Sequence, residues 1–309
     1  MAYDVVIIGG GPAGLAAALL LGRARKRVLL CDAGSRRNAA AQGIHGFVTR
    51  DGTPPAEFRR IAREQLAPYV SVEVRDAAVH DVRQAADGFD VTLDEGHVRT
   101  RRVLLATGMV DGVPDTPGFR ELWGRAVFQC PYCHAWEVRD LPFGYLASRP
   151  AAVEWALLLR SWTDDVMVFT DGRFAVPEDT RRRLAAAGMP IEERPIAALA
   201  AHEADRGSSA GELSGIRLAD GTTVARRVLF AHPRQHQVRL VTQLAVSLDE
   251  DGYVQVDGDA MTSIAGVHAA GDLTTPMQSA TLAAAAGARA AASINRALTI
   301  ERAVSSTTT

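Results

Sequence analysis

A glycine-rich turn near the amino terminus constrains this chain more than any other feature. Residues 3–8 are a short, β-branched apolar stretch, a G-x-G-x-x-G run begins at Gly9, and a second apolar stretch spans 13–23. This order predicts a buried strand, a tight turn and a helix. Residues 26–32 predict a second buried strand. Together these segments form a βαβ unit, typical of a doubly wound α/β fold.

Each glycine of the turn has a separate physical role. Gly9 permits the tight turn, Gly11 lets the backbone approach a pyrophosphate, and Gly14 allows close packing of helix on strand. The amino terminus of the helix then directs its partial positive charge at the phosphates. Asp32 ends the second strand, where a carboxylate can accept hydrogen bonds from an adenosine ribose. The pattern predicts dinucleotide binding; a purely structural glycine turn is the alternative.

The remainder of the chain predicts a second domain of the same class. Glycines and prolines punctuate residues 112–118, and another strand–helix–strand pattern follows over 143–169. An alanine-rich helix is predicted over 278–298, after strand signals at 253–256 and 266–270. We therefore expect an α/β protein with two Rossmann-like domains. The predicted boundaries are 1–113 with 246–300 for a discontinuous first domain, 114–245 for an inserted second domain, and 301–309 for a tail.

Composition restricts the class of function. The chain has 34 basic and 36 acidic residues, and this near balance argues against a nucleic-acid partner, which usually meets a basic stripe. Three cysteines are too few for a secreted disulfide framework. The apolar start has Asp4 where a signal peptide has basic residues, and glycines interrupt it. We expect a cytoplasmic protein that does not associate with membranes.

Cys130 and Cys133 form a C-P-Y-C-H motif that has three chemical interpretations. C-x-x-C-H is also the signature of c-type haem attachment, but that reaction takes place outside the cytoplasm. A zinc site needs about four ligands, and the other cysteine, Cys31, lies in a predicted buried strand. A redox dithiol is the interpretation we favour, because this spacing allows a disulfide and a helix amino terminus stabilises the thiolate. His134 follows as a general acid or base near neutrality, or simply as a residue that begins a helix.

Two tripeptides at predicted strand ends, Ala106-Thr107-Gly108 and Ala270-Gly271-Asp272, complete a resemblance. With the glycine turn and the cysteine pair, residues 3–298 resemble the thioredoxin reductase family. The resemblance implies an FAD-binding first domain, an NAD(P)H-domain-like insertion, a redox-active cysteine pair and a homodimer. The run C-P-Y-C-H-x-W-E is similar to the branch that contains gliotoxin- and holomycin-type dithiol oxidases and NADPH-independent flavin disulfide reductases.

The resemblance also implies the site residues. Asp272 would contact the ribityl and phosphate part of FAD, while Met277 and Gln278 would lie against the flavin ring; His45 is a weaker candidate there. The implied catalytic residues are Cys130, Cys133 and His134, and no metal ligands are expected. The implied FAD-binding residues are Gly9, Gly11, Pro12, Ala13, Gly14, Asp32, Ala33, His45, Val79, Thr107, Gly108, Gly271, Asp272, Met277 and Gln278.

The second domain departs from the family at its nucleotide turn. Ala147, Arg149 and Ala152 stand where the family has a second G-x-G-x-x-[GA] motif. Alanine disfavours a positive-φ turn, and Arg149 places a long side chain where bare backbone should meet a pyrophosphate. Asp171 follows the next strand, where the family has a basic cluster for the 2′-phosphate of NADPH. We predict weak or absent NADPH binding; the alternative is that Arg149 itself pairs with a phosphate.

Three functions agree with these observations. The first is oxidation of a small-molecule dithiol by FAD and O2 without NADPH. The second is reduction of a thioredoxin-like disulfide with electrons from ferredoxin or another non-NADPH donor. The third is a flavin redox sensor without turnover, which the intact cysteine pair beside an intact FAD motif makes the least favoured.

Overall fold

The computed structural model describes residues 3–201 and 212–307, which form two compact units. The first unit consists of Met1–Val110 with Gln235–Thr309, and the second of Asp111–Arg234. The sequence predicted that the chain returns to the first domain at residues 245/246, whereas in the structure it returns at 234/235. The reason is helix α6 (Arg239–Leu244), which carries Leu240 and Val241 into an apolar cluster of the first unit.

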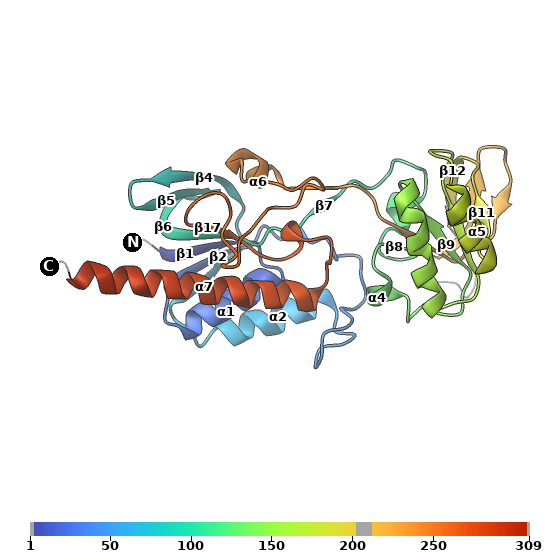
Figure 1. Cartoon of the computed structure of the whole chain (residues 1–309). Coiled ribbons are helices and arrows are strands. Elements are labelled where there is room, and N and C mark those ends of the chain that lie inside the picture. Colours follow the sequence, from blue (N-terminus) through green and yellow to red (C-terminus); the bar gives the residue numbers. More distant parts are fainter. Residues whose placement is uncertain (1–2, 202–211, 308–309) are drawn as a thin grey trace. The chain divides into compact units, whose positions relative to one another are not determined.

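A seven-stranded sheet forms the centre of the first unit (Figure 1). Strand β1 is parallel to both of its neighbours, β2 and β6, and all of its residues from Val5 on are buried. The long strand β6 pairs with β5 over its first half and with β17 over its last three residues. The strands are β1 (Tyr3–Ile8), β2 (Val28–Cys31), β3 (Val72–Arg75), β4 (Val79–Ala85), β5 (Gly88–Leu93), β6 (Gly96–Leu105) and β17 (Val267–Ala269).

Three helices cover one face of this sheet: α1 (Pro12–Arg23), α2 (Pro55–Leu66) and α7 (Ala280–Thr307) (Figure 1). Small residues allow α1 and α7 to approach closely, because a Cβ atom added to Gly287 would lie 2.0 Å from the backbone oxygen of Ala13. Helix α7 continues to Thr307, beyond its predicted end near residue 298, so most of the expected tail is helical. Residues 308–309 lie outside the described residues.

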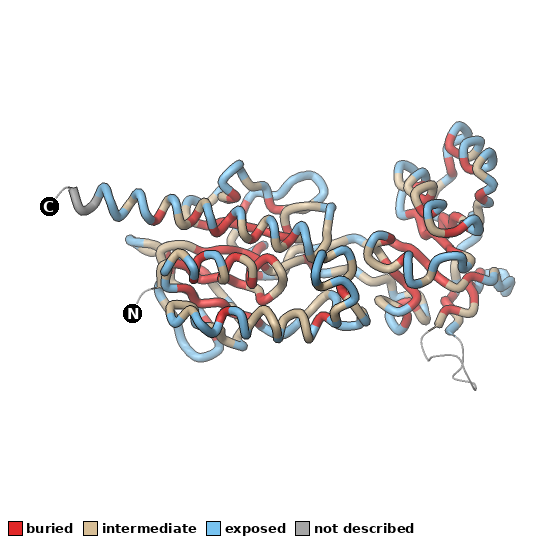
Figure 2. The backbone as a smooth tube through the Cα atoms, turned by 90° about the horizontal axis from the view of Figure 1, so that it is seen from below, coloured by how far each residue is buried: buried red, intermediate tan, exposed pale blue. Residues whose placement is uncertain are grey.

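The second unit has a five-stranded parallel sheet in the order β11-β10-β9-β15-β8 and a three-stranded antiparallel sheet. Figure 2 shows buried segments inside each unit separately. The parallel strands are β8 (Val127–Phe128), β9 (Phe143–Leu146), β10 (Val166–Phe169), β11 (Ile191–Glu192) and β15 (Val228–Ala231), and the antiparallel ones β12 (Ile196–Ala201), β13 (Leu213–Leu218) and β14 (Thr223–Val224). The helices are α3 (Phe119–Leu122), α4 (Pro131–His134), α5 (Glu178–Ala186) and the 3₁₀ helix η1 (Pro150–Ser161).

Strands β14 and β15 are close in sequence but belong to different sheets, because β14 pairs with β13 whereas β15 enters the parallel sheet. One predicted strand is wrong. The strand expected over 253–256 is a loop that contributes only an isolated bridge between Leu248 and Val254. There the amide of Val254 donates to the oxygen of Leu273, so tertiary contacts override the strand preference of the sequence.

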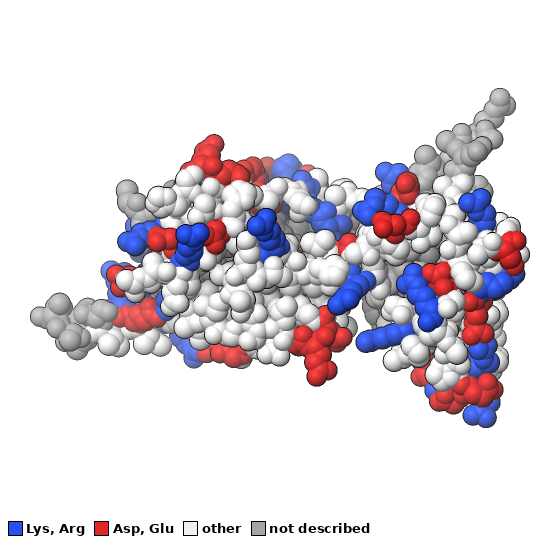
Figure 3. Space-filling view, turned by 90° about the horizontal axis from the view of Figure 1, so that it is seen from above, with Lys and Arg blue, Asp and Glu red and all other residues white. Residues whose placement is uncertain are grey.

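The two chain crossings carry the short strands β7 (Val110–Asp111) and β16 (Gln235–His236), which pair with each other. Acidic and basic side chains are intermixed on the face in Figure 3. Among the described helices, none combines the length and the hydropathy needed to cross a bilayer.

Candidate flavin and disulfide sites

The glycine turn at the end of β1 is built as the sequence predicts. Gly9 has φ +118°, and a Cβ atom there would lie 2.1 Å from the backbone oxygen of Ala106. A Cβ atom on Gly14 would lie 1.9 Å from the backbone oxygen of Gly9. Packing within the chain therefore explains two of the three glycines.

Gly11 differs from the other two because nothing lies within 4 Å of the position of its missing Cβ. It is the N-cap residue of α1, and Pro12 begins the helix. The first amide groups of a helix lack partners within the helix and attract anions. Gly11 thus presents bare backbone to open space in front of a helix amino terminus, which fits a pyrophosphate.

Three segments that are distant in sequence meet at this edge of the sheet. β6 pairs with both β1 and β17, so Leu105 lies opposite Ile8 on one side and Ala269 on the other. Because parallel strands end at a common edge, the Thr107-Gly108 and Gly271-Asp272 segments lie next to the glycine turn. Within that edge, a Cβ atom on Gly271, which has φ +96°, would lie 3.0 Å from the Cβ of Ala13.

Thr107 supplies a polar group that the chain itself does not use. Its Oγ1 atom is buried and has no hydrogen-bond partner in the described part of the chain. A buried hydroxyl without a partner costs free energy, so such groups in native proteins often serve a ligand or a water molecule. Gly108 follows with φ +66°. These features favour a bound group at the end of β6.

Asp32 is held more firmly than the sequence indicated. The residue is 5% exposed, and its Oδ1 atom accepts a hydrogen bond from the amide of Gly34 at 3.0 Å. Its Oδ2 atom contacts the guanidinium groups of Arg59 and Arg63, the latter at 3.1 Å. A ribose at this position would share the carboxylate with two arginines. Sequence reasoning missed both, although their spacing of four residues on α2 places them on one helix face.

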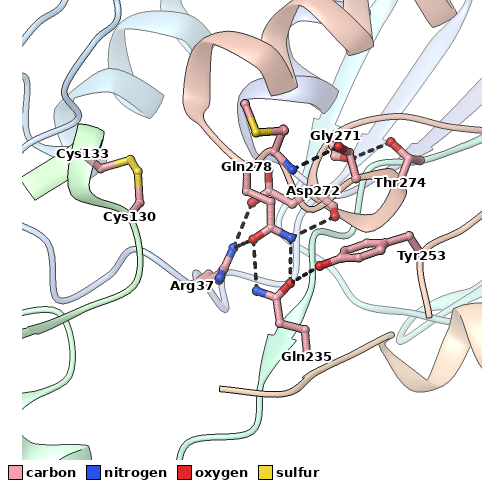
Figure 4. A network of polar contacts seen from close by, with 11 residues as sticks. Arg37, Cys130, Cys133, Gln235, Tyr253, Gly271, Asp272, Thr274 and Gln278 are labelled. Atoms are coloured by element: carbon pink, nitrogen blue, oxygen red, sulfur yellow. Dashed lines mark hydrogen bonds and ion pairs between the residues drawn. A yellow bond between two sulfur atoms is a disulfide. The ribbon is translucent and has the colours of Figure 1, made fainter. Parts of the chain in front are cut away.

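Side chains on both sides of Asp272 form the hydrogen-bond network drawn in Figure 4. Arg37 Nη1 lies 3.3 Å from Asp272 Oδ2 and also donates to Gln278 Oε1. Gln278 and Gln235 exchange two amide hydrogen bonds of 2.8 and 3.0 Å, and the hydroxyl of Tyr253 donates to Gln235 Oε1 at 3.0 Å. The structure therefore brings the predicted Asp272 and Gln278 together, and it adds Arg37, Gln235 and Tyr253, which the sequence did not indicate.

Four predicted flavin residues remain: His45, Met277, Ala33 and Val79. The loop of His45 contacts the first turn of α7, because Thr281 Oγ1 donates to the oxygen of Gly46 at 2.9 Å, and His45 Nδ1 is 3.7 Å from Asp51 Oδ1. Met277 is exposed. Ala33 is exposed next to Asp32, and Val79 begins β4 half-buried. The roles of these four residues stay predictions.

Cys130 and Cys133 are joined by a disulfide bond, with their Cα atoms 5.3 Å apart. Cys130 is the N-cap residue of α4, and the amide of Cys133 donates to the oxygen of Cys130 at 3.3 Å. The predicted helix start is present, but α4 has only four residues. The redox-dithiol interpretation of the motif therefore agrees with the structure.

His134 is held by its ring rather than left on the surface. Its imidazole stacks on the phenyl ring of Phe128, with 4.5 Å between ring centroids and an angle of 10° between ring planes. Phe128 ends β8 and is itself buried. The stacking fixes the plane of the imidazole directly after the second cysteine, an arrangement that suits a group that moves a proton.

The second unit repeats the turn of the first unit at the level of backbone. The amide of Gly9 donates to Cys31, the last residue of β2, at 2.8 Å; the amide of Ala147 donates to Phe169, the last residue of β10, at 2.9 Å. Gly11 is the N-cap of a helix that begins with proline, and so is Arg149. The structure thus equates Ala147 with Gly9 and Arg149 with Gly11.

Beyond that equivalence the second turn differs. Ala147 is fully buried and, unlike Gly9, is absent from the described residues with positive φ. Arg149 is extended and exposed at the helix N-cap. After β10, Asp171 accepts a hydrogen bond from the amide of Ile196 at 2.6 Å and pairs with Arg173 at 2.8 Å.

The family model described as pyridine nucleotide-disulphide oxidoreductase matches residues 3–288. This chain belongs to that family. Thioredoxin reductase sirT of Leptosphaeria maculans is 31% identical over 309 residues, covering 95% of this chain and 93% of that protein. The crystal structure of HlmI has a TM-score of 0.90 with 39% identity, covering 99% of this chain and 95% of that one. An oxidoreductase from Agrobacterium tumefaciens has a TM-score of 0.88 with 37% identity, covering 97% of this chain and 99% of that chain.

Membership confirms the coarse interpretation of the sequence. The protein is an FAD-dependent pyridine nucleotide-disulphide oxidoreductase with a thioredoxin reductase-like fold. In this oxidoreductase the first unit has the residues that fit FAD: the Gly11 backbone and helix start for the pyrophosphate, Thr107 for a buried polar contact, and the Asp272–Gln278 segment. Bound FAD would supply two-electron redox chemistry.

Cys31 is a free cysteine outside the disulfide. It lies in the interior of the sheet at the end of β2, is 2% exposed, and burial raises the pKa of its thiol to about 12. A thiol of that kind is not a nucleophile near neutrality. The sequence prediction that Cys31 is a buried strand residue is confirmed.

Proposed function

We propose that this oxidoreductase converts small-molecule dithiols to disulfides, with O2 as the final electron acceptor and without NADPH. One observation carries the proposal: Arg149 occupies the N-cap position that Gly11 occupies in the first unit. A pyrophosphate needs bare backbone at that position. A flavin enzyme that takes no hydride from NADPH must receive its electrons elsewhere, and a dithiol that meets the Cys130–Cys133 disulfide is a suitable donor.

The proposed reaction proceeds by two thiol–disulfide exchanges. One thiolate of the substrate attacks Cys130 Sγ, the bond between the two cysteines breaks, and Cys133 leaves as a thiolate. The second thiolate of the substrate then attacks the substrate sulfur of the mixed disulfide, and Cys130 leaves as a thiolate. The substrate has lost two electrons and two protons, and the cysteine pair holds the electrons. We assign the first attack to Cys130 by resemblance to the family, in which the first cysteine is the outer one.

His134 has the place of the general base in this scheme. The second substrate thiol must lose its proton before it can attack, and an imidazole is the side chain best suited to accept one near neutral pH. The stacking on Phe128 keeps the ring in one plane beside Cys133. The first unit would hold FAD, which would supply the two-electron chemistry that links the cysteine pair to O2. The pair returns to its disulfide, and the two electrons with the two protons lost by the substrate convert O2 to hydrogen peroxide. We further propose, from the family resemblance, a homodimer in the cytoplasm.

The reverse direction is the second candidate, and the names of the relatives favour it. Several curated relatives at about 30% identity are called thioredoxin reductases. In this case ferredoxin or another non-NADPH donor would reduce FAD, and the cysteine pair would reduce a thioredoxin-like disulfide. The degenerate second turn agrees with both directions, so only the donor and the acceptor distinguish them.

The deciding experiment is anaerobic stopped-flow spectroscopy of flavin bleaching. The FAD-loaded enzyme is mixed in turn with NADPH, NADH, dithiothreitol and reduced ferredoxin, and oxygen uptake is then measured with dithiothreitol in air. We expect rapid bleaching by dithiothreitol, little bleaching by either nicotinamide, and oxygen consumption with formation of peroxide. Rapid bleaching by NADPH, or dithiol bleaching without oxygen uptake, would overturn the proposal; bleaching by ferredoxin alone would favour the reductase.

A pair of variants tests the role of Arg149. Arg149→Met removes the charge but keeps a long side chain, whereas Arg149→Gly with Ala147→Gly restores the two glycines of the motif. If the side chain blocks the pyrophosphate, NADPH should bind the double variant more tightly than it binds wild type, and R149M should resemble wild type. If R149M instead loses residual NADPH affinity, Arg149 is a phosphate ligand.

A further inference from the structure

The two exposed aromatic side chains of this protein both lie beside the redox disulfide. Tyr132 is 68% exposed and Trp136 is 63% exposed. All other Phe, Tyr and Trp residues, every one of them in the described part of the chain, are buried or half-buried. Tyr132 stands between the two cysteines, and Trp136 follows Cys133 by three residues. Aromatic rings gain free energy by burial, so two exposed rings at one place call for a function.

Both rings are held in position by neighbours in the second unit. The ring of Tyr132 meets that of Trp162 edge to face, with 5.4 Å between centroids. The guanidinium of Arg139 lies 4.2 Å from the centroid of the Trp136 ring, and its Nη1 atom donates to the oxygen of Trp136 at 2.8 Å. The rings are therefore preorganised, which lowers the entropy that a ligand must overcome when it binds them.

We infer that Tyr132 and Trp136 determine substrate specificity by binding the ring of a small dithiol that carries an aromatic or other flat unsaturated ring. This inference rests on the proposed dithiol oxidation. Tyr132 and Trp136 are at most three residues from Cys133 in sequence, so a molecule whose sulfur reaches the cysteine pair comes close to both side chains. Flat rings stack on Tyr and Trp. The positive charge of Arg139 favours the thiolate, the form of the substrate that attacks.

A small molecule fits this surface better than a protein. A stable protein interface takes about 20 to 30 residues on each side, whereas Tyr132 and Trp136 are the two large apolar residues that are exposed within residues 130–140. Charged and exposed residues of both signs follow at once, Glu137, Arg139 and Asp140. This segment therefore offers stacking at two points, next to charged side chains.

The test compares dithiols with and without a ring. The probes are 1,2-benzenedimethanethiol, which carries its thiols on methylene carbons, and 1,4-butanedithiol, which has no ring. The second-order rate constant for anaerobic flavin bleaching is measured for wild type, Tyr132→Leu, Trp136→Leu and Trp136→Phe. Val70→Ala, an exposed apolar position in the first unit, is the control.

We expect wild type to prefer the ring-bearing probe, and each leucine variant to reduce that preference by about three- to tenfold. W136F should retain most of the preference because it keeps a ring, and V70A should match wild type. An unchanged preference in both leucine variants would overturn the inference. So would a loss of activity with a protein thioredoxin while the ratio between the two small dithiols stays constant, since the rings would then serve a protein.

Binding without reaction separates this inference from the proposed function. 1,2-Benzenedimethanol has the ring but no thiol, and its binding can be followed by tryptophan fluorescence in wild type and in W136F and Y132L. If it binds wild type and Y132L weakens binding, but no dithiol bleaches the flavin, the proposed function fails and the ring site stands. If dithiols bleach the flavin and the diol does not bind, the proposed function stands and the ring site fails.

Discussion

Substituting the glycines of the first turn separates the requirements of the fold from those of the ligand. Gly14→Ala places a methyl group 1.9 Å from the backbone oxygen of Gly9, and backbone cannot rotate away as a side chain can. Overpacking of this kind costs about 3 kcal/mol at the upper end, and the better helix propensity of alanine offsets about 1 kcal/mol. The net loss of about 2 kcal/mol corresponds to a fall in Tm of about 4–8 °C for a unit of this size.

Gly11→Ala should leave the stability of the apoprotein almost unchanged and weaken FAD binding. Its backbone has φ −80° and ψ −177°, which any residue can adopt, and no atom lies within 4 Å of the new Cβ. Loss of glycine at the N-cap costs about 0.5–1 kcal/mol, and restriction of the unfolded chain returns about 0.4–1 kcal/mol. The apoprotein should therefore unfold close to the wild-type temperature. FAD should bind about 10- to 150-fold more weakly, because hydrogen bonds to a charged group contribute about 1.5–3 kcal/mol.

Two measurements on the apoprotein check these expectations: thermal unfolding by circular dichroism, and FAD affinity by quenching of flavin fluorescence. Gly258→Ala is the matched control, because that glycine is exposed and also has nothing within 4 Å. Wild-type FAD affinity in G11A would refute the placement of the pyrophosphate at α1. A strongly destabilised G11A apoprotein would refute the separation of the two roles.

Three further predictions concern the sulfur atoms and a buried histidine. Cys130→Ser and Cys133→Ser should each abolish flavin bleaching by dithiols while FAD content stays at wild type; retained bleaching in either variant would exclude the exchange scheme. Iodoacetamide should label two thiols after mild reduction of the native protein and a third only after unfolding, because burial raises the pKa of Cys31 to about 12; three labels in the native state would contradict this. Burial lowers the pKa of His268 from its ordinary value of 6.5, so its stabilising effect is present above pH 6.5 and is lost as pH falls below it. Urea unfolding at pH 7.5 and pH 5.5 should show a smaller acid loss in His268→Asn, by up to about 1.4 kcal/mol per pH unit, and equal losses would contradict the assignment.

The parts of the flavin site that the sequence predicted are those set by backbone. A glycine turn after a buried strand has few conformations, and parallel strands end at one edge. The order of strands and turns along the chain is therefore sufficient to bring the glycine turn (residues 9–14), Thr107 and Asp272 together. The same holds for Cys130 and Cys133, whose spacing permits a disulfide.

The parts that the sequence did not predict depend on long-range pairing of side chains. Arg37 lies in a loop without periodicity and reaches Gln278, which follows 241 residues later. Arg59 and Arg63 lie on α2 and contact Asp32, which follows β2. No local pattern encodes such partners, because each depends on how loops and helices pack on the finished sheet. The second domain boundary was misplaced for a similar reason, since α6 follows the crossing but packs on the first unit.

The two turns of this one chain also show which contacts belong to the fold and which to the ligand. In both turns the backbone amide that follows the first strand donates a hydrogen bond to the last residue of the next strand, from Gly9 to Cys31 and from Ala147 to Phe169. Both helices also begin with proline after an N-cap residue. The second turn loses two features of the first: the positive φ of Gly9, where Ala147 stands, and the bare backbone at the N-cap, where Arg149 replaces Gly11. The shared contacts stabilise a βαβ unit with or without a nucleotide, whereas the glycine at that position has no packing function in the first turn. A chain can therefore lose nucleotide binding at the second turn without losing the fold, and this independence is the physical basis for assigning the two units different roles.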